Sequence, residues 1–496
     1  MSDGAGSKNV IVGGLGWTTS AALANAVFRF LSLIIFARLL TPSELGGAGI
    51  AMAVIGLLVL LSNMGLRQSL VRHAELQSKV LHVCFTYLML SSGLIVSAGF
   101  AASSQVASFF EIVELDPALV LGLAMIPIVN LGYVSEAQLI KQYRFKSLAM
   151  IELVSYVVSY FGLGLLLAMK GYGLLSLVAA YAAEGVVRSL ILFSMSPYGL
   201  KPSFDYRKIR ELLVVGGGIS ITQIQGYLAN NGDNLIIGKI LGATAVGLYG
   251  RAYQIMALPA NLIGTSLDKV LYPVMCRQQA NHRALSDIFL SSQAVLSFLL
   301  IPATILVASE SLNILELLLG KGWEDAAKIL PILACGIFFR AGYKVGDAAV
   351  RSLGFVYRRS LRQAVYVISV LGFSGLGALW YGIEGASLGV TVAIVINYLL
   401  VFELLATCIG IRVRDLVVAI SPSLAPSLIL LILYGLLDHG IGGVGLPLAD
   451  LMIKTILFIL VVWFSLRINR VRHNDYMKRS IQGAPWLARK VYAGGA

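Results

Sequence analysis

The sequence predicts an all-helical integral membrane protein that crosses the bilayer about 14 times, with roughly 20 apolar residues in each crossing. Long apolar segments recur along the chain and are separated by short loops. Hydrophobic residues make up 58% of the 496 residues and charged residues only 13%, about half the charged fraction that is usual in soluble domains. The mean hydropathy of +0.83 agrees with this class.

The predicted crossings follow one another at short intervals along most of the chain. Each is an apolar run that is long enough to span the hydrocarbon core as a helix. They are residues 11–40, 46–66, 80–103, 118–139, 148–169, 172–195, 211–240, 244–267, 284–308, 329–352, 361–380, 383–409, 416–437 and 447–467.

Lys and Arg concentrate in alternate loops, and this alternation predicts the orientation of the chain. The basic loops include Arg67, Arg72, Lys79, Lys141, Arg144, Lys201, Arg207, Lys269, Arg277, Arg351, Arg358, Arg412 and Arg414, whereas the intervening loops carry Glu111, Glu114, Asp116, Glu310, Glu316, Glu324 and Asp325. We expect both termini in the cytoplasm and no nucleic-acid partner, although the net charge is +13. The basic tail either lies against anionic lipid headgroups or is solvated without a partner.

Cysteine and histidine residues give no sign of a metal or disulfide framework. Cys84, Cys276, Cys335 and Cys408 lie far apart in or beside apolar runs, without a CxxC pair. The five His residues lack the spacing of metal ligands. We therefore expect inert thiols and no cofactor.

The chain repeats itself at an offset of roughly 200–215 residues, as membrane transporters with parallel repeats do. Three matches occur in the same order in both halves: Val12-Gly13-Gly14 with Val215-Gly216-Gly217, Arg38-Leu39-Leu40 with Lys239-Ile240-Leu241, and Tyr143-Arg144 with Tyr357-Arg358. The repeat predicts two six-helix lobes related by a pseudo-two-fold axis along the membrane normal, with the substrate site between them.

This repeat gives a domain organisation in which the last two crossings form an additional helix hairpin. The predicted parts are a cytoplasmic N-terminus at 1–10, an N-lobe of helices 1–6 at 11–195, a cytoplasmic linker at 196–210, a C-lobe of helices 7–12 at 211–409, extra helices 13 and 14 at 416–467, and a basic cytoplasmic tail at 468–496.

Ionisable residues inside the crossings are the candidate site residues, because an ionised group at mid-bilayer costs about 3 kcal/mol and usually faces a cavity or a partner. Helical spacing places Asn25 and Arg29 on one face of the first crossing, and Asn230, Asp233 and Asn234 on one face of the seventh. Arg29 acts in substrate binding or gating, or forms a buried ion pair with Asp233.

The tenth crossing adds Arg340, Lys344 and Asp347 at positions i, i+4 and i+7. Two cations beside one acid leave a surplus positive charge that suits a diphosphate, unless one cation snorkels to the membrane interface. Asp233 and Asp347 are candidates for coupling or gating.

Three other charged positions are weaker candidates. Arg251 is expected at the periplasmic mouth. Glu152 either takes part in ion coupling or neutralises a basic loop. Glu184 and Arg188 lie four residues apart, which predicts a local ion pair.

Several short motifs resemble a known family. They are Asp233-Asn234-x-x-Ile237-Gly238, Leu241-Gly242, Val246-Gly247-x-Tyr249, Ala252-Tyr253 and Pro259 in the second half, Ala37-Arg38-Leu39-Leu40-Thr41-Pro42 with Glu44 and Gly46 in the first, and Gly320-x-x-Trp323. This set resembles the polysaccharide-transport branch of the multidrug/oligosaccharidyl-lipid/polysaccharide exporter superfamily, over roughly residues 10–467.

The resemblance implies a central cavity, alternating access and a transporter rather than an enzyme. The implied activity is to flip an undecaprenyl-diphosphate-linked oligosaccharide to the periplasmic leaflet of a bacterial inner membrane. A polysaccharide polymerase and chain-length machinery are the expected protein partners, and H+ or Na+ is the expected coupling ion if the transport is an antiport.

Three alternatives stay open at the level of the sequence. A drug or cation exporter would favour a cavity with acidic or apolar walls. A peptidoglycan-precursor flippase would share the superfamily but carry another cargo. A membrane-embedded polymerase or glycosyltransferase would need acids or nucleophiles arranged on sizeable loops, and the longest non-cytoplasmic loop, 309–328, is only about 20 residues long and shows no acid–base constellation.

Overall fold

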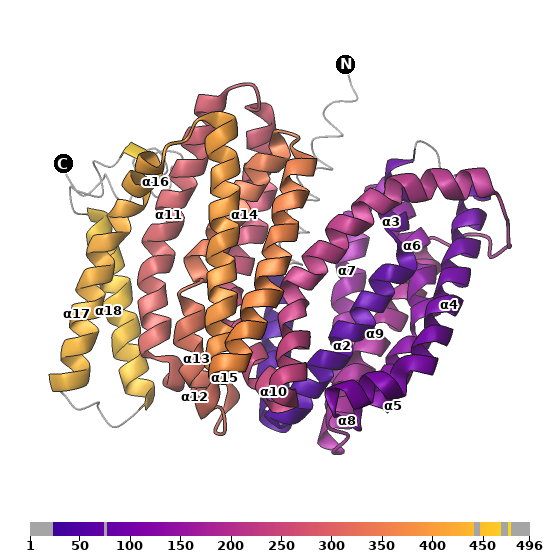
Figure 1. Cartoon of the computed structure of the whole chain (residues 1–496), viewed down its shortest axis with the longest axis horizontal. Coiled ribbons are helices and arrows are strands. Elements are labelled where there is room, and N and C mark those ends of the chain that lie inside the picture. Colours follow the sequence, from indigo (N-terminus) through magenta and orange to yellow (C-terminus); the bar gives the residue numbers. More distant parts are fainter. Residues whose placement is uncertain (1–22, 74–76, 441–446, 468–474, 478–496) are drawn as a thin grey trace. The chain divides into compact units, whose positions relative to one another are not determined.

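The computed structural model of the chain describes residues 23–73, 77–440, 447–467 and 475–477, and every regular element in these ranges is a helix (Figure 1). The predicted all-helical class is confirmed for the described residues. The N-terminus at 1–10, residues 11–22 of the first predicted crossing, and the tail at 468–496 apart from 475–477 lie outside them.

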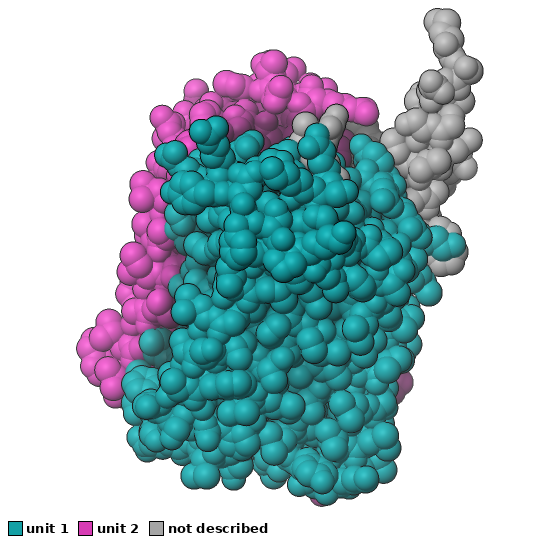
Figure 2. Space-filling view, turned by 90° about the vertical axis from the view of Figure 1, so that its right-hand side faces the viewer, with its two compact units in different colours: residues 1–250 teal, residues 251–496 magenta. Residues whose placement is uncertain are grey.

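The chain divides into two compact units, Met1–Gly250 and Arg251–Ala496, which Figure 2 shows in teal and magenta. The seventh predicted crossing belongs to the first unit. There the Ser69 hydroxyl donates to the Leu212 carbonyl at 2.7 Å, and the Tyr227 hydroxyl donates to the Ala53 carbonyl at 2.8 Å. The lobe boundary at 196–210 stays a prediction.

The first unit consists of helices that follow the predicted crossings closely. They are a helix at 23–39, α2 (Pro42–Asn63), α3 (Leu66–Arg72), α4 (Ser78–Phe110), α5 (Leu115–Ala124), α6 (Ile126–Lys141), α7 (Phe145–Tyr156), the π-helix η1 (Val157–Gly164), α8 (Leu165–Met169), α9 (Leu174–Met195), and the part of α10 (Tyr206–Arg277) up to Gly250.

The second unit continues from the end of α10. Its helices are α11 (His282–Ser309), α12 (Ser311–Leu319), α13 (Glu324–Ala334), α14 (Ile337–Ser352), α15 (Val356–Ile409), α16 (Val413–Ile420), the short 3-10 helix η2 (Ser421–Ser423), α17 (Leu424–Gly440) and α18 (Pro447–Arg467). Among the described residues, 10 helices are long and apolar enough to cross a membrane, or 11 if α13 and α14, which meet at a 46° bend, form one span.

Local signals in the sequence explain where two of these helices begin. At α2 the Thr41 hydroxyl accepts from the Glu44 amide at 3.3 Å, and the Glu44 carboxylate accepts from the Thr41 amide at 2.7 Å, which is a capping box with Pro42 at the first helical position. At α10 the Asp205 carboxylate accepts from the Lys208 amide at 3.3 Å, and this bond lowers the pKa of Asp205.

Glycine marks the breaks inside the two longest helices. In α10 the backbone leaves helical geometry at Gly242 (φ 83°, ψ 178°), between the predicted crossings 211–240 and 244–267. The Tyr249 hydroxyl donates to the Asp233 carboxylate across this break. In α15 the break lies at Tyr381 and Gly382, between the predicted crossings 361–380 and 383–409. A positive φ of this kind favours glycine, so both breaks were predictable.

The start of α2 and the segment of α10 after its break touch through their backbones. A Cβ atom on Gly46 would lie 1.8 Å from the Ala243 carbonyl oxygen, and one on Gly247 would lie 1.8 Å from the Pro42 carbonyl oxygen. Only residues without a side chain allow this distance, which accounts for two glycines of the motifs.

A buried ion pair attaches the C-terminal helices to the rest of the second unit. The Lys454 ammonium on α18 lies 2.6 Å from the Glu310 carboxylate and 2.7 Å from the Asp438 carboxylate on α17. The side chains of Lys454 and Glu310 are 7% and 2% exposed, so this contact is protected from water. The hairpin predicted at 416–467 therefore packs against the end of α11.

Besides α3, which contains Arg67 and Arg72 of an expected basic loop, two elements were not predicted. The segment 309–328, which we expected to be a loop, contains α12. The fifth predicted crossing, 148–169, contains the π-helix η1 instead of a regular α-helix. Both were missed because a short helix and a change of helical pitch leave the hydropathy profile unchanged.

Candidate functional site

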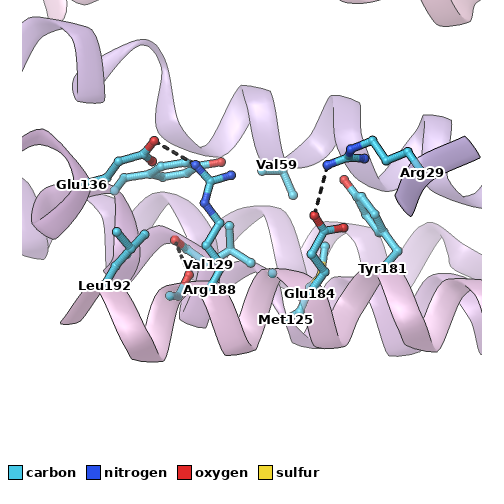
Figure 3. Close-up of a pocket in the computed structure, with 13 residues that line it drawn as sticks. Arg29, Val59, Met125, Val129, Glu136, Tyr181, Glu184, Arg188 and Leu192 are labelled. Atoms are coloured by element: carbon cyan, nitrogen blue, oxygen red, sulfur yellow. Dashed lines mark hydrogen bonds and ion pairs between the residues drawn. The ribbon is translucent and has the colours of Figure 1, made fainter. Parts of the chain in front are cut away.

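A polar pocket of about 240 Å³ lies among the helices of the first unit (Figure 3). Its charged residues come from three segments: Arg29 from the helix at 23–39, Glu136 from α6, and Glu184 and Arg188 from α9. The remaining lining residues are Val59, Met125, Val129, Gly132, Tyr133, Tyr181, Gly185, Ser189 and Leu192. Charged groups and aromatic rings thus share one cavity between apolar helices.

Small residues bring α6 and α9 together beside the pocket. A Cβ atom on Gly132 would lie 2.6 Å from the Ser189 hydroxyl oxygen, and one on Gly185 would lie 2.8 Å from a methyl carbon of Val129. The two helices therefore approach closely on this side, and the longer side chains of α9 point into the cavity, where Figure 3 shows them.

At one end of the pocket Arg29 lies between two carboxylates. Its guanidinium is 3.4 Å from Glu184 and 3.7 Å from Glu152, and its side chain is 50% exposed. The same guanidinium lies over the ring of Tyr156, 4.5 Å from the ring centroid. This cation is thus held by two acids and an aromatic face.

At the other end two arginines converge on one carboxylate. Arg67 and Arg188 each donate to the same oxygen of Glu136 at 2.9 Å, and the Glu136 side chain is 7% exposed. The predicted local pair of Glu184 with Arg188 was therefore wrong. Both side chains point into the pocket, where each forms an ion pair with a residue of another helix: Glu184 with Arg29, and Arg188 with Glu136 (Figure 3).

The π-helix η1 contributes to the wall around Arg29. Tyr156, the last residue of α7, and Tyr160 in η1 stack with their ring centroids 4.4 Å apart. The Tyr156 hydroxyl also forms a hydrogen bond with Ser32 on the helix at 23–39. The wider turn of a π-helix changes the direction of side chains and is frequent at functional sites.

The other candidates of the first unit lie mostly on α10. Asn25 is buried at 8% exposure in the helix at 23–39. The Asn230 side-chain amide donates to the Gly226 carbonyl at 2.6 Å, and the Asn234 backbone amide donates to the Asp233 carboxylate at 2.9 Å. Asp233 accepts from Tyr249 on its own helix, and the ion pairs of Arg29 are with Glu152 and Glu184 instead of the alternative partner Asp233.

The candidates of the second unit form a separate group on α14 and the end of α10. Arg340 donates to the Tyr253 hydroxyl, and Lys344 donates to the Asn261 side chain at 2.8 Å. Arg251 donates to the Gln254 side chain at 2.6 Å.

The carboxylate of this group, Asp347, is bound by cations outside the predicted set. Arg351 lies 3.1 Å from it, and Arg359 donates to both of its oxygens. Arg351 lies one turn further along α14 and Arg359 lies at the start of α15, so both reach Asp347 more easily than the cations that precede it.

Sequence reasoning did not group the residues that line the pocket of the first unit into one site. Glu136, Glu184 and Arg188 are ionisable residues within predicted crossings, so the free-energy cost of placing them in the membrane could have identified them as stronger site candidates. No such signal exists for Tyr133 and Tyr181, because tyrosine is common in membrane helices. In the part of the chain that the structure describes, no three His, Cys, Asp or Glu residues are placed to hold a metal ion.

A bundle of membrane helices around a charged pocket is typical of membrane transport proteins. Among solved structures, the fold is similar to the lipid II flippase MurJ in an inward closed conformation, with a TM-score of 0.76 at 16% identity, covering 90% of this chain and 97% of that chain. It is also similar to an inward-facing multidrug resistance MATE family transporter of the MOP superfamily, with a TM-score of 0.62 at 15% identity and coverage of 77% and 94%.

Residues 35–328 match the Polysaccharide biosynthesis protein family, and the chain belongs to that family. It is 23% identical to the succinoglycan biosynthesis transport protein ExoT of Rhizobium meliloti, over 68% of this chain and 69% of that protein. It is 22% identical to the lipopolysaccharide biosynthesis protein WzxC of Escherichia coli, over 82% and 84%. The resemblance that the motifs indicated is confirmed, and ExoT, MurJ and the MATE protein are named as a transport protein, a flippase and a transporter rather than as enzymes.

Proposed function

We propose that the protein is a flippase that moves an undecaprenyl-diphosphate-linked oligosaccharide, a precursor of exopolysaccharide, capsule or O-unit, from the cytoplasmic to the periplasmic leaflet by alternating access. The similar proteins named for succinoglycan and lipopolysaccharide biosynthesis support the glycan as cargo. A bacterial inner membrane is the proposed location, with both termini in the cytoplasm.

The charged pocket is the observation that carries this proposal. Three arginines and three glutamates from different helices meet in or beside it: Arg29, Arg67, Arg188, Glu136, Glu152 and Glu184. Each would cost about 3 kcal/mol at mid-bilayer without a partner or water. A polar cavity inside a membrane bundle suits a transported ligand that is itself polar, as a glycan headgroup is.

Fourteen crossings in two lobes are consistent with the helices described. The candidate spans 216–261 and 357–409 have 46 and 53 residues, more than twice the roughly 20 residues that one crossing needs, and each breaks at a glycine. Dividing both spans, joining α13 to α14, and adding the helix at 23–39 gives the fourteen crossings of the proposal. The pseudo-two-fold relation of the lobes belongs to the same proposal.

The site residues keep their predicted roles as proposals. Arg29, Arg340, Lys344, Asn25, Asn230, Asn234 and Arg251 would contact substrate, and Asp233, Asp347 and Glu152 would act in coupling or gating. H+ or Na+ is the proposed coupling ion. The proposed partners are the lipid-linked glycan, the bilayer, and a polysaccharide polymerase with its chain-length machinery.

Deletion and complementation test the proposed function. We expect a deletion strain to lose its surface polysaccharide and to accumulate a lipid-linked glycan in the cytoplasmic leaflet. The wild-type gene should restore export, whereas Arg29→Ala and Arg340→Ala should reduce it about tenfold or more at equal protein level, the effect of losing about 1.4 kcal/mol of binding.

Lys328→Ala is the matched control, because this cation is 63% exposed and forms an ion pair with Asp325, three residues before it, at 2.8 Å. It should restore export fully. Normal surface polysaccharide in the deletion strain would overturn the proposal, and a new drug sensitivity with unaltered polysaccharide would favour a drug exporter instead.

A further inference from the structure

We propose that the pocket lined by Arg29, Glu136, Glu184 and Arg188 binds one uncharged sugar residue of the lipid-linked glycan, and not its diphosphate. This inference rests on the proposed function and names the ligand of one site. The sequence assigns Arg29 to substrate binding or gating, and this inference names the part of the substrate that its pocket binds.

The first argument is charge. The ionisable Arg and Glu residues that line the pocket are two of each sign, and each carboxylate lies within 3.4 Å of an arginine of the lining. A diphosphate would enter beside two carboxylates and would have to displace them from their arginines. A neutral ligand meets no such repulsion, so the balanced lining favours it.

The second argument is hydrogen bonding. An arginine only donates and a carboxylate only accepts, whereas a sugar hydroxyl does both. Neighbouring hydroxyl groups can therefore bridge an arginine and a glutamate without breaking the ion pair. The Arg29–Glu184 pair and the Arg188–Glu136 pair lie at opposite ends of the pocket (Figure 3), which offers such a bridge on both sides of one ring.

The third argument is size and surface. A volume of about 240 Å³ corresponds to roughly eight waters at about 30 Å³ each, which is room for one pyranose ring. Tyr133, Tyr181 and Val59 also line the cavity. Aromatic and apolar side chains suit the C–H faces of a sugar ring, and the tyrosine hydroxyls add polar contacts.

Binding measurements on the full-length protein in lipid nanodiscs test this inference. The two probes are the lipid-linked glycan purified from the deletion strain and undecaprenyl diphosphate without sugar. We expect Glu184→Gln to weaken binding of the glycan-bearing lipid about tenfold and to leave binding of undecaprenyl diphosphate unchanged.

Tyr181→Phe is the second variant, because it removes one hydroxyl and keeps the ring that packs in the cavity. It should weaken binding of the glycan-bearing lipid about two- to tenfold, again without an effect on the bare lipid. Lys328→Ala, whose cation is 63% exposed, should bind both lipids as the wild type does.

The remaining outcomes separate this inference from the proposed function. If the variants bound both lipids more weakly to the same extent, the pocket would bind the diphosphate, and the inference would be overturned. If both variants bound both lipids as the wild type does, the pocket would have no part in binding the substrate, and the inference would be overturned as well. If the wild type bound neither lipid, the proposed function itself would fail, and the inference with it.

Discussion

At the scale of single residues, Glu136 is the position on which the pocket depends most directly. It accepts from Arg67 of α3 and Arg188 of α9 while its own side chain is nearly buried. Removing one partner of a buried ion pair leaves the other charge without compensation in a low-dielectric environment. Glu136 thus joins three helices through one carboxylate.

We therefore expect Glu136→Gln to lower the free energy of unfolding by about 1–3 kcal/mol, because two arginines lose the charge that they share. The thermal melting of the purified protein in detergent measures this. Glu111→Gln is the control, since its side chain is 82% exposed and 3.4 Å from Lys239, and it should cost at most about 0.5 kcal/mol. Equal melting temperatures of the two variants would contradict the prediction.

At the scale of elements, glycine sets both the breaks and the closest contacts of the helices. Gly242 and Gly382 allow the positive φ at which α10 and α15 change direction. Within α15, a Cβ atom on Gly377 would lie 2.0 Å from the Gly385 carbonyl oxygen, so the two arms of this helix pack at backbone distance. Inside a membrane the hydrophobic effect does not drive helices together, and small residues allow them to associate by letting their backbones pack closely.

The contact between α2 and α10 gives a prediction at this scale. Gly247→Ala should destabilise the protein by about 3 kcal/mol or more, because the new methyl group would overlap the Pro42 carbonyl oxygen, a backbone atom that cannot move alone. Gly250→Ala, nearly one turn further along the same helix, meets no atom within 4 Å. It should be neutral or stabilise by up to about 1 kcal/mol. Similar melting curves for both variants would show that α2 and α10 separate easily.

At the scale of the whole molecule, the alternation of basic and acidic loops defines the expected orientation in the membrane. Tyr357 is 92% exposed and precedes two arginines, Arg358 and Arg359, whereas Val113 is 85% exposed between Glu111 and Glu114. The positive-inside bias predicts that the first position lies in the cytoplasm and the second in the periplasm.

Cysteine labelling tests this orientation. In a chain whose four cysteines are replaced by alanine, Val113→Cys should react with a membrane-impermeant maleimide in intact spheroplasts. Tyr357→Cys should react only after the membrane is opened. The reverse pattern would invert the proposed topology, and reaction of both positions in intact spheroplasts would contradict it as well.

Much of the fold was predictable from local information. The breaks at Gly242 and Gly382, the start of α2 at Thr41, and the ranges of most apolar helices follow from hydropathy, glycine and capping residues that lie close together in the chain. The site was less predictable. Arg29 was recognised as a cation inside a predicted crossing, but its neighbours Glu184 and Glu152 were assigned other roles, because they follow it by more than 100 residues.

The sequence by itself determined the class of the protein, its helices and their breaks, since the cost of placing a residue in lipid depends on that residue and its near neighbours. Only the tertiary structure decided which charges pair. Arg29 with Glu184, Arg188 with Glu136, and Asp233 with Tyr249 are choices among several partners of suitable charge or polarity. The packing of the helix at 23–39, α6 and α9 decides the first two pairs, and the break of α10 at Gly242 brings the third pair together.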